Sequence, residues 1–152
     1  MPIPNAPLAQ VARLFKQHLA TGLDAAGNNI EVVVGPPEAP ANRERHRVNV
    51  FFYRVAPAEV HTGHGPDQPA WLYVQCLITA FGIDENQVTP HENALRLLGD
   101  VMRILHEQPV LEPWQLGARV APGSEGRVQT VQLRIVMESL SLDDLYKLWS
   151  AQ

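Results

Sequence analysis

The sequence has few of the features that mark disulfide-stapled proteins or membrane proteins. It holds one cysteine in 152 residues, and charged residues make up only 18%. Cys76 has no partner for an internal disulfide, and its apolar surroundings predict a buried thiol rather than a nucleophile. The longest apolar runs fall far short of the roughly 20 residues that span a bilayer, so we expect a soluble protein with no membrane partner.

Targeting and charge signals are equally sparse. The start, Met1 to Asn5, lacks a basic segment followed by an apolar stretch, so we expect synthesis in the cytoplasm. The formal net charge of -4 favours solubility and gives no electrostatic reason for nucleic-acid binding.

Signatures of catalysis are missing too. There is no Gly-x-Ser-x-Gly elbow and no glycine-rich phosphate loop. The one compact histidine pair, His61 and His64, has metal-ligand spacing but no nearby residues that complete a recognised metal pattern. We therefore expect no enzyme, no cofactor and no metal site, and keep as an alternative a small metal-binding hydrolase that uses these two histidines.

What the sequence does have is a clear succession of periodic segments. Thr89, Pro90 and Glu92 form a capping box with proline at the first helical position, which predicts the start of a helix that ends before Pro109. The other expected elements are helices over 8–20 and from 141 onward, and strands over 30–34, 47–55, 70–81 and about 131–137. This order, with no repeat and no long linker, predicts one α+β domain over residues 1–152.

Two groups of residues are candidates for an interface. The run Arg43-Glu44-Arg45-His46-Arg47 is either a solvated entry to a strand or a docking patch for an acidic partner, in which case the protein is a cargo or partner adaptor. Large aromatic residues on the second face of two strands either pack in the core or anchor a neighbouring subunit. The candidate interface residues are Arg43, Arg45, Arg47, Phe51, Tyr53, Trp71 and Tyr73.

Four stretches taken together carry a resemblance to a known family. They are residues 48–55, residues 72–82 (LYVQCLITAFG), residues 91–111 with HENALRLLGD and LHEQPVL, and residues 138–151 (ESLSLDDLYKLWSA). In this order they resemble the N-terminal domain of the cap, or tail-terminator, protein of extracellular contractile injection systems, the virulence-cassette and antifeeding-prophage type. The resemblance covers about residues 8–151, although some family members are longer than this chain.

The resemblance implies a fold and a function. The expected fold, similar to phage tail terminators, is a mixed and mainly antiparallel sheet of four or more strands flanked by helices. The expected function is a structural cap: a homo-oligomer, a hexameric ring, that binds the inner tube protein and the sheath protein and ends their polymerisation. The family's motifs supply no catalytic residues. Such a cap would assemble in the bacterial cytoplasm and then leave the cell as part of an injection particle.

Overall fold

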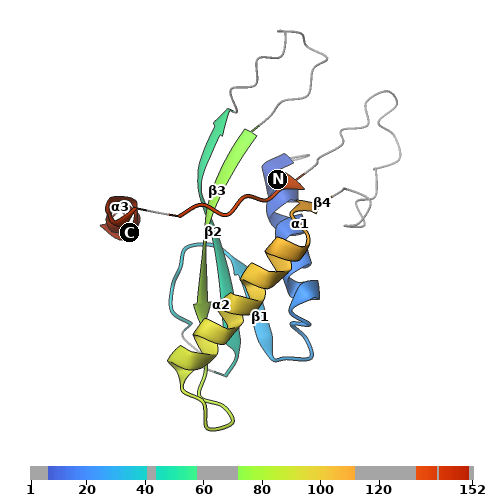
Figure 1. Cartoon of the computed structure of the whole chain (residues 1–152), viewed down its shortest axis with the longest axis vertical. Helices are drawn as coiled ribbons and strands as arrows, with labels where there is room; N and C mark the ends of the chain where they lie inside the picture. Colours follow the sequence, from blue (N-terminus) through green and yellow to red (C-terminus); the bar gives the residue numbers. More distant parts are fainter. Residues whose placement is uncertain (1–6, 41–43, 58–71, 112–132, 140, 151–152) are drawn as a thin grey trace, which may run out of the picture.

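The computed structural model describes residues 7–40, 44–57, 72–111, 133–139 and 141–150. Three helices and five short or medium strands follow one another in this part of the chain (Figure 1). Their bounds are α1 Pro7–Gly22, β1 Ile30–Val34, β2 His46–Pro57, β3 Leu72–Phe81, α2 Pro90–Glu107, β4 Val110–Leu111, β5 Leu133–Arg134 and α3 Leu142–Ser150.

The main sheet has three strands in the order β1-β2-β3. β1 and β2 are parallel, with Val32 opposite Val48, whereas β2 and β3 are antiparallel, with Val50 opposite Ile78. The register between β2 and β3 shifts between Phe52 and Arg54, which leaves Tyr53 as the extra residue of a bulge. β4 and β5 form a second, antiparallel pair at the end of α2.

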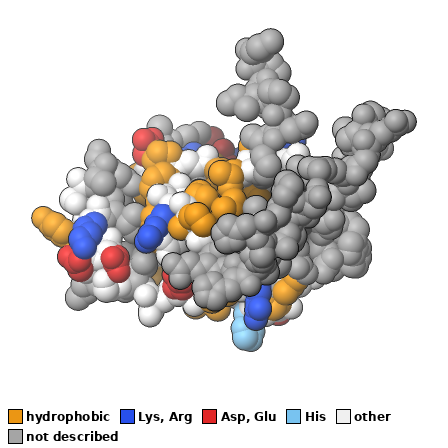
Figure 2. Space-filling view, turned by 90° about the horizontal axis from the view of Figure 1, so that it is seen from above, with side chains coloured by type: hydrophobic (Ala, Val, Ile, Leu, Met, Phe, Trp, Pro, Cys, Tyr) orange, Lys and Arg blue, Asp and Glu red, His pale blue; other side chains and the backbone are white. Residues whose placement is uncertain are grey.

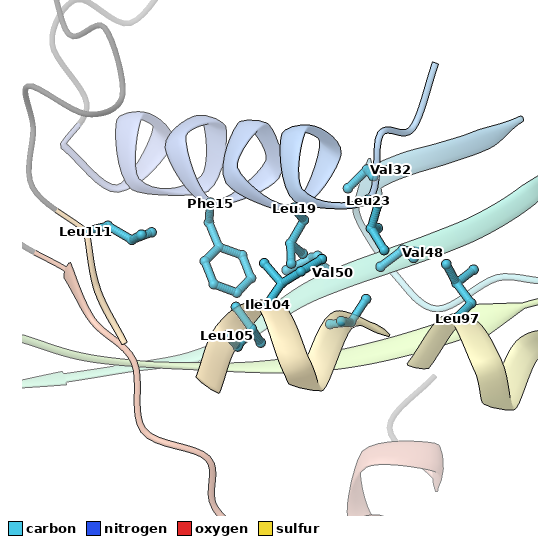
Figure 3. Packing of buried hydrophobic residues seen from close by; sticks show 11 residues of the cluster. Phe15, Leu19, Leu23, Val32, Val48, Val50, Leu97, Ile104, Leu105 and Leu111 are labelled. Carbon is cyan, nitrogen blue, oxygen red and sulfur yellow. The ribbon is translucent and has the colours of Figure 1, made fainter. Parts of the chain in front are cut away.

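The core lies between one face of the main sheet and the helices α1 and α2. Phe15 and Leu19 of α1 point toward Ile104 and Leu105 of α2 and toward Val50 of β2 (Figure 3). The rings of Phe15 and Phe52 meet edge to face with centroids 6.2 Å apart. The apolar residues that we expected on one side of each helix therefore build a layer of helices on a sheet, which is the ordinary way to bury amphipathic faces.

The other face of the central strand is covered by the connection from β1 to β2. Asn49 is 2% exposed, although its neighbours Val48 and Val50 point into the core on the opposite face. Its side-chain amide donates to the carbonyl oxygens of Gly35 and Pro36, at 2.6 and 3.0 Å. The segment after β1 thus crosses the outer face of β2, and one buried amide fastens it there.

The start of α2 is fixed by both its cap and a glycine. Thr89 Oγ1 accepts a hydrogen bond from the Glu92 backbone N–H at 3.3 Å, as the sequence predicted. Gly82, just after β3, lies so close to α2 that a Cβ there would stand 2.1 Å from the Pro90 carbonyl oxygen. Gly99, which we read in the helix as a possible point of close backbone approach, has nothing within 4 Å of its Cβ position among the described residues.

The chain ends in an arm that we define as residues 135–150. It starts beside β4, where the Ile135 N–H donates to the Pro109 carbonyl oxygen at 2.7 Å, and runs across the strands to α3 on the far side of the molecule (Figure 1). The strand expected over about 131–137 is wrong in extent, because β5 holds only Leu133–Arg134 and Val131 lies outside the described residues. Leu133 and Ile135 pack on the core, whereas Val136 and Met137 are exposed. In the described part of the chain, residues 135–137 pair with no strand, so the alternating pattern does not extend β5.

The fold class is confirmed: one α+β domain with a mixed sheet and helices, and two of the three strand pairings in its described part are antiparallel. Its five described strands belong to two sheets rather than to one.

Candidate interaction surfaces

The basic run at the start of β2 is largely engaged within the domain. Arg47 reaches the Glu31 carboxylate of β1 at 2.9 Å, and the two residues stand opposite each other in the sheet register. Arg45 is exposed, and Arg43 lies outside the described residues. Arg47 is therefore a cross-strand ion pair in this fold, which leaves Arg45 as the described arginine of the run that faces solvent.

His46 in the same run holds the turn before α2. Its Nε2 lies 3.0 Å from Glu85 Oε2, and its Nδ1 accepts the backbone N–H of Ile83 at 3.2 Å. Because Nδ1 accepts a hydrogen bond, Nε2 must carry the proton that is shared with Glu85. The sequence carries no sign of this contact, since Glu85 is 39 positions away and only the fold brings the two residues together.

The predicted aromatic face is only partly assembled. Phe51 and Tyr53 are half-buried and Tyr73 is 65% exposed, while Trp71 lies outside the described residues. The register places Phe51 opposite Leu77 and Tyr73 opposite Ala56, so these two aromatic residues do not stand directly opposite each other. Their role in an interface stays a prediction.

The end of the hairpin formed by β2 and β3 exposes apolar side chains. Val55, Leu72 and Tyr73 stand close together in the register, and each is exposed by nearly half or more. Figure 2, which views the molecule from this end, shows hydrophobic side chains near the middle and acidic, basic and apolar side chains on the left, where α3 lies. Apolar groups that face solvent at the end of a domain are typical of an interaction surface.

Helix α1 presents a basic surface. Its sequence contains Arg13 and Lys16 and no acidic residue, and both cations are exposed. Neither has an acidic partner within 4.0 Å among the described residues. By contrast, the cations of α2 are neutralised on their own helix, where Arg96 pairs with Glu92 and Arg103 with Glu107. We missed this surface in the sequence, although a charge count for each helix would have found it.

The arm is acidic. It contains Glu138, Asp143 and Asp144 against one base, Lys147. Glu138 accepts a hydrogen bond from Gln75 of β3 at 3.1 Å, and Lys147 pairs with Asp143 on α3 itself. Burial, and next the Glu138 carboxylate, raise the pKa of Tyr53, which agrees with the arm lying near the bulge of β2. The arm starts near α1 and crosses the strands, so that its helix α3 and the basic helix α1 lie on opposite sides of the domain (Figure 1).

Of the reactive side chains considered in the sequence, Cys76 and His18 lie in the described part of the chain. His61 and His64 lie outside the described residues, and no cluster of three potential metal ligands occurs within the described ranges. Cys76 is half-buried beside the core, and burial raises its pKa to about 11, so the thiolate is scarce at neutral pH. His18 is nearly buried in α1, and burial lowers its pKa.

Comparison with known families matches residues 8–152 to the domain described as the Pvc16 N-terminal domain. The chain belongs to the Pvc16 N-terminal domain family. The match confirms the resemblance inferred from the four sequence stretches, which cover almost the same residues. No curated protein matches the sequence.

Membership of the Pvc16 family associates the chain with phage-tail-like injection systems. The family is a structural one and is not a known enzyme family. In agreement with the composition, the helices in the described part of the chain are too short or too polar to cross a membrane.

Proposed function

We propose that this chain is the cap, or tail terminator, of a phage-tail-like contractile injection system. In this role it forms a hexameric ring on the last layer of inner tube and sheath and ends their polymerisation. The match to the Pvc16 N-terminal domain over residues 8–152 carries the proposal. Assembly takes place in the bacterial cytoplasm, and the ring leaves the cell within the finished particle.

The surfaces of the domain support this proposal. A closed ring needs a head-to-tail contact, in which one patch of each copy meets a different patch of the next. Helix α3, with Asp143 and Asp144, and the basic side of α1 are two such patches, and they lie on opposite sides of the domain (Figure 1). The apolar end of the hairpin, with Val55, Leu72 and Tyr73, is available for a further contact with tube or sheath.

Electron microscopy of particles made without this chain tests the proposal. We expect tubes of uncontrolled length or unstable sheaths, and normal particles once the full chain is supplied again. Native mass spectrometry of the purified chain should show about six copies, either in solution or after binding to isolated tubes. Normal particles in its absence would contradict the proposal. So would a strictly monomeric protein that does not bind tube ends.

A further inference from the structure

We propose that the C-terminal helix α3 of one copy docks on the basic side of helix α1 of the next copy, so that the arm links successive subunits. This inference deepens the proposed function and rests on it, since it names the contact that closes the ring. It concerns described residues of both helices: Arg13 and Lys16 on α1, and Asp143, Asp144 and Tyr146 on α3.

The first reason is that the described side chains of α3, among them Asp143, Asp144 and Tyr146, are exposed. The helix is 9 residues long, and helices this short are marginal in water without tertiary packing. Tyr146 is 74% exposed, and Val136, in the segment that leads to α3, is 70% exposed. Apart from the bond between Glu138 and Gln75, the hydrogen bonds and ion pairs of residues 136–150 in the described structure stay within the arm.

The second reason is charge complementarity. The arm has three acids and one lysine, and that lysine is already paired with Asp143. Helix α1 has two exposed cations and no acid. Ala9 and Ala20 continue the side of α1 that carries Arg13 and Lys16, and Gln17, one turn after Arg13, is exposed and uncharged. Opposite potentials on two patches favour their encounter and fix its orientation.

The third reason is placement. In Figure 1, α1 lies on the right of the domain and α3 on the left, with the sheet between them. Helix α3 therefore cannot reach α1 of its own copy in this arrangement, whereas α3 of the next copy can bind there. This contact is heterologous, because it joins two different surfaces. A series of copies joined in this way closes into a ring if the rotation between successive copies allows it.

Charge reversal and rescue test the contact in the full chain. We expect Arg13→Glu/Lys16→Glu to raise the concentration of half-maximal ring assembly about ten-fold or more, because attraction becomes repulsion. Asp143→Lys/Asp144→Lys should have a similar effect, and combining the four substitutions should restore assembly to within about three-fold. The control Arg96→Glu/Arg103→Glu carries the same change in net charge at two exposed positions of α2 and should leave assembly nearly unchanged. Circular dichroism checks that each variant is folded.

A cross-link gives a second readout that does not depend on charge. Lys16→Cys combined with Asp144→Cys should produce ladders of disulfide-linked copies under mild oxidation, whereas each single variant should stop at dimers or monomers. Native Cys76 reacts slowly, since burial raises its pKa to about 11. Rings of unchanged stability in Arg13→Glu/Lys16→Glu, together with no ladder, would overturn this contact and leave the cap proposal standing. A wild-type chain that never self-associates, even on tube ends, would overturn both.

Discussion

Helices α2 and α3 begin in the same way and differ in what holds them. Thr89 caps α2 through the Glu92 N–H at 3.3 Å, and Ser141 caps α3 through the Asp144 N–H at 3.2 Å. Helix α2 then buries Leu97, Val101, Ile104 and Leu105 in the core, whereas the exposed residues of α3 include Tyr146. Local chemistry therefore sets where each helix starts, while burial decides how strongly it is bound to the domain.

The largest expected effect comes from removing a buried side chain of α2. Leu105 is 6% exposed, and Leu105→Ala should cost about 2–5 kcal/mol of the free energy of unfolding, measured by chemical denaturation. Leu95→Ala on the same helix, at 56% exposure, and Tyr146→Ala on α3 should each change it by less than about 0.5 kcal/mol. A cost for Tyr146→Ala close to that of Leu105→Ala in the monomer would show that α3 is packed like α2.

The next effect concerns the anchoring of the first turn of α2 against the end of β3. In Gly82→Ala the new Cβ would meet backbone atoms of Pro90 and Ala94, so we expect a loss of about 1–3 kcal/mol in the free energy of unfolding. Gly99→Ala is the matched control, because its Cβ would meet no described atom within 4 Å. Alanine in the middle of a helix should stabilise the monomer by about 0.5–1 kcal/mol. A stabilising Gly82→Ala, read from the same denaturation curves, would refute the close approach.

The caps give a smaller effect that compares the two helices directly. Thr89→Ala should lower the free energy of unfolding by about 1 kcal/mol, since it leaves a backbone N–H of a packed helix without its partner. Ser141→Ala should leave global unfolding nearly unchanged and accelerate hydrogen exchange within α3 alone. Equal effects of the two substitutions on global unfolding would mean that the arm and the rest of the domain unfold as one unit.

The weakest expected effect is a change of stability with pH that arises from His18 of α1. Burial lowers the pKa of His18 below its usual 6.5, so the unfolded chain takes up a proton first as the pH falls. The contribution of His18 to stability is therefore complete above pH 6.5 and is lost progressively below it. Unfolding measured between pH 8 and 5 should be less pH-dependent in His18→Gln, while His106→Gln, at an exposed position, serves as the control. An unchanged slope in His18→Gln would contradict this assignment.

Most of the main elements could be predicted from sequence, because their signals are local. The capping box at Thr89 placed the start of α2, and the β-branched run of β1 gave its bounds. The second sheet could not be predicted, since β4 and β5 have two residues each and depend on Leu111 meeting Leu133 across a long connection. Periodicity alone cannot show which strand has a partner.

The interface was harder to predict than the fold. The run from Arg43 to Arg47 stood out by composition, but Arg47 and His46 are engaged with Glu31 and Glu85, which lie 16 and 39 positions away. The basic side of α1 and the acidic arm were overlooked, because the cations and acids of each are spaced along a helix or an extended segment. Their charges suggest a contact between copies only once the structure places α1 and α3 on opposite sides of the domain.

The order of the chain also bears on when its surfaces become available. Every buried hydrophobic residue of the described core lies between Phe15 and Leu111, and the arm follows at the C-terminal end. During synthesis the N-terminal part leaves the ribosome first, and domains fold as units as they emerge. Helix α1, with the surface proposed to bind α3 of a neighbouring copy, is therefore made before α3 of the same chain.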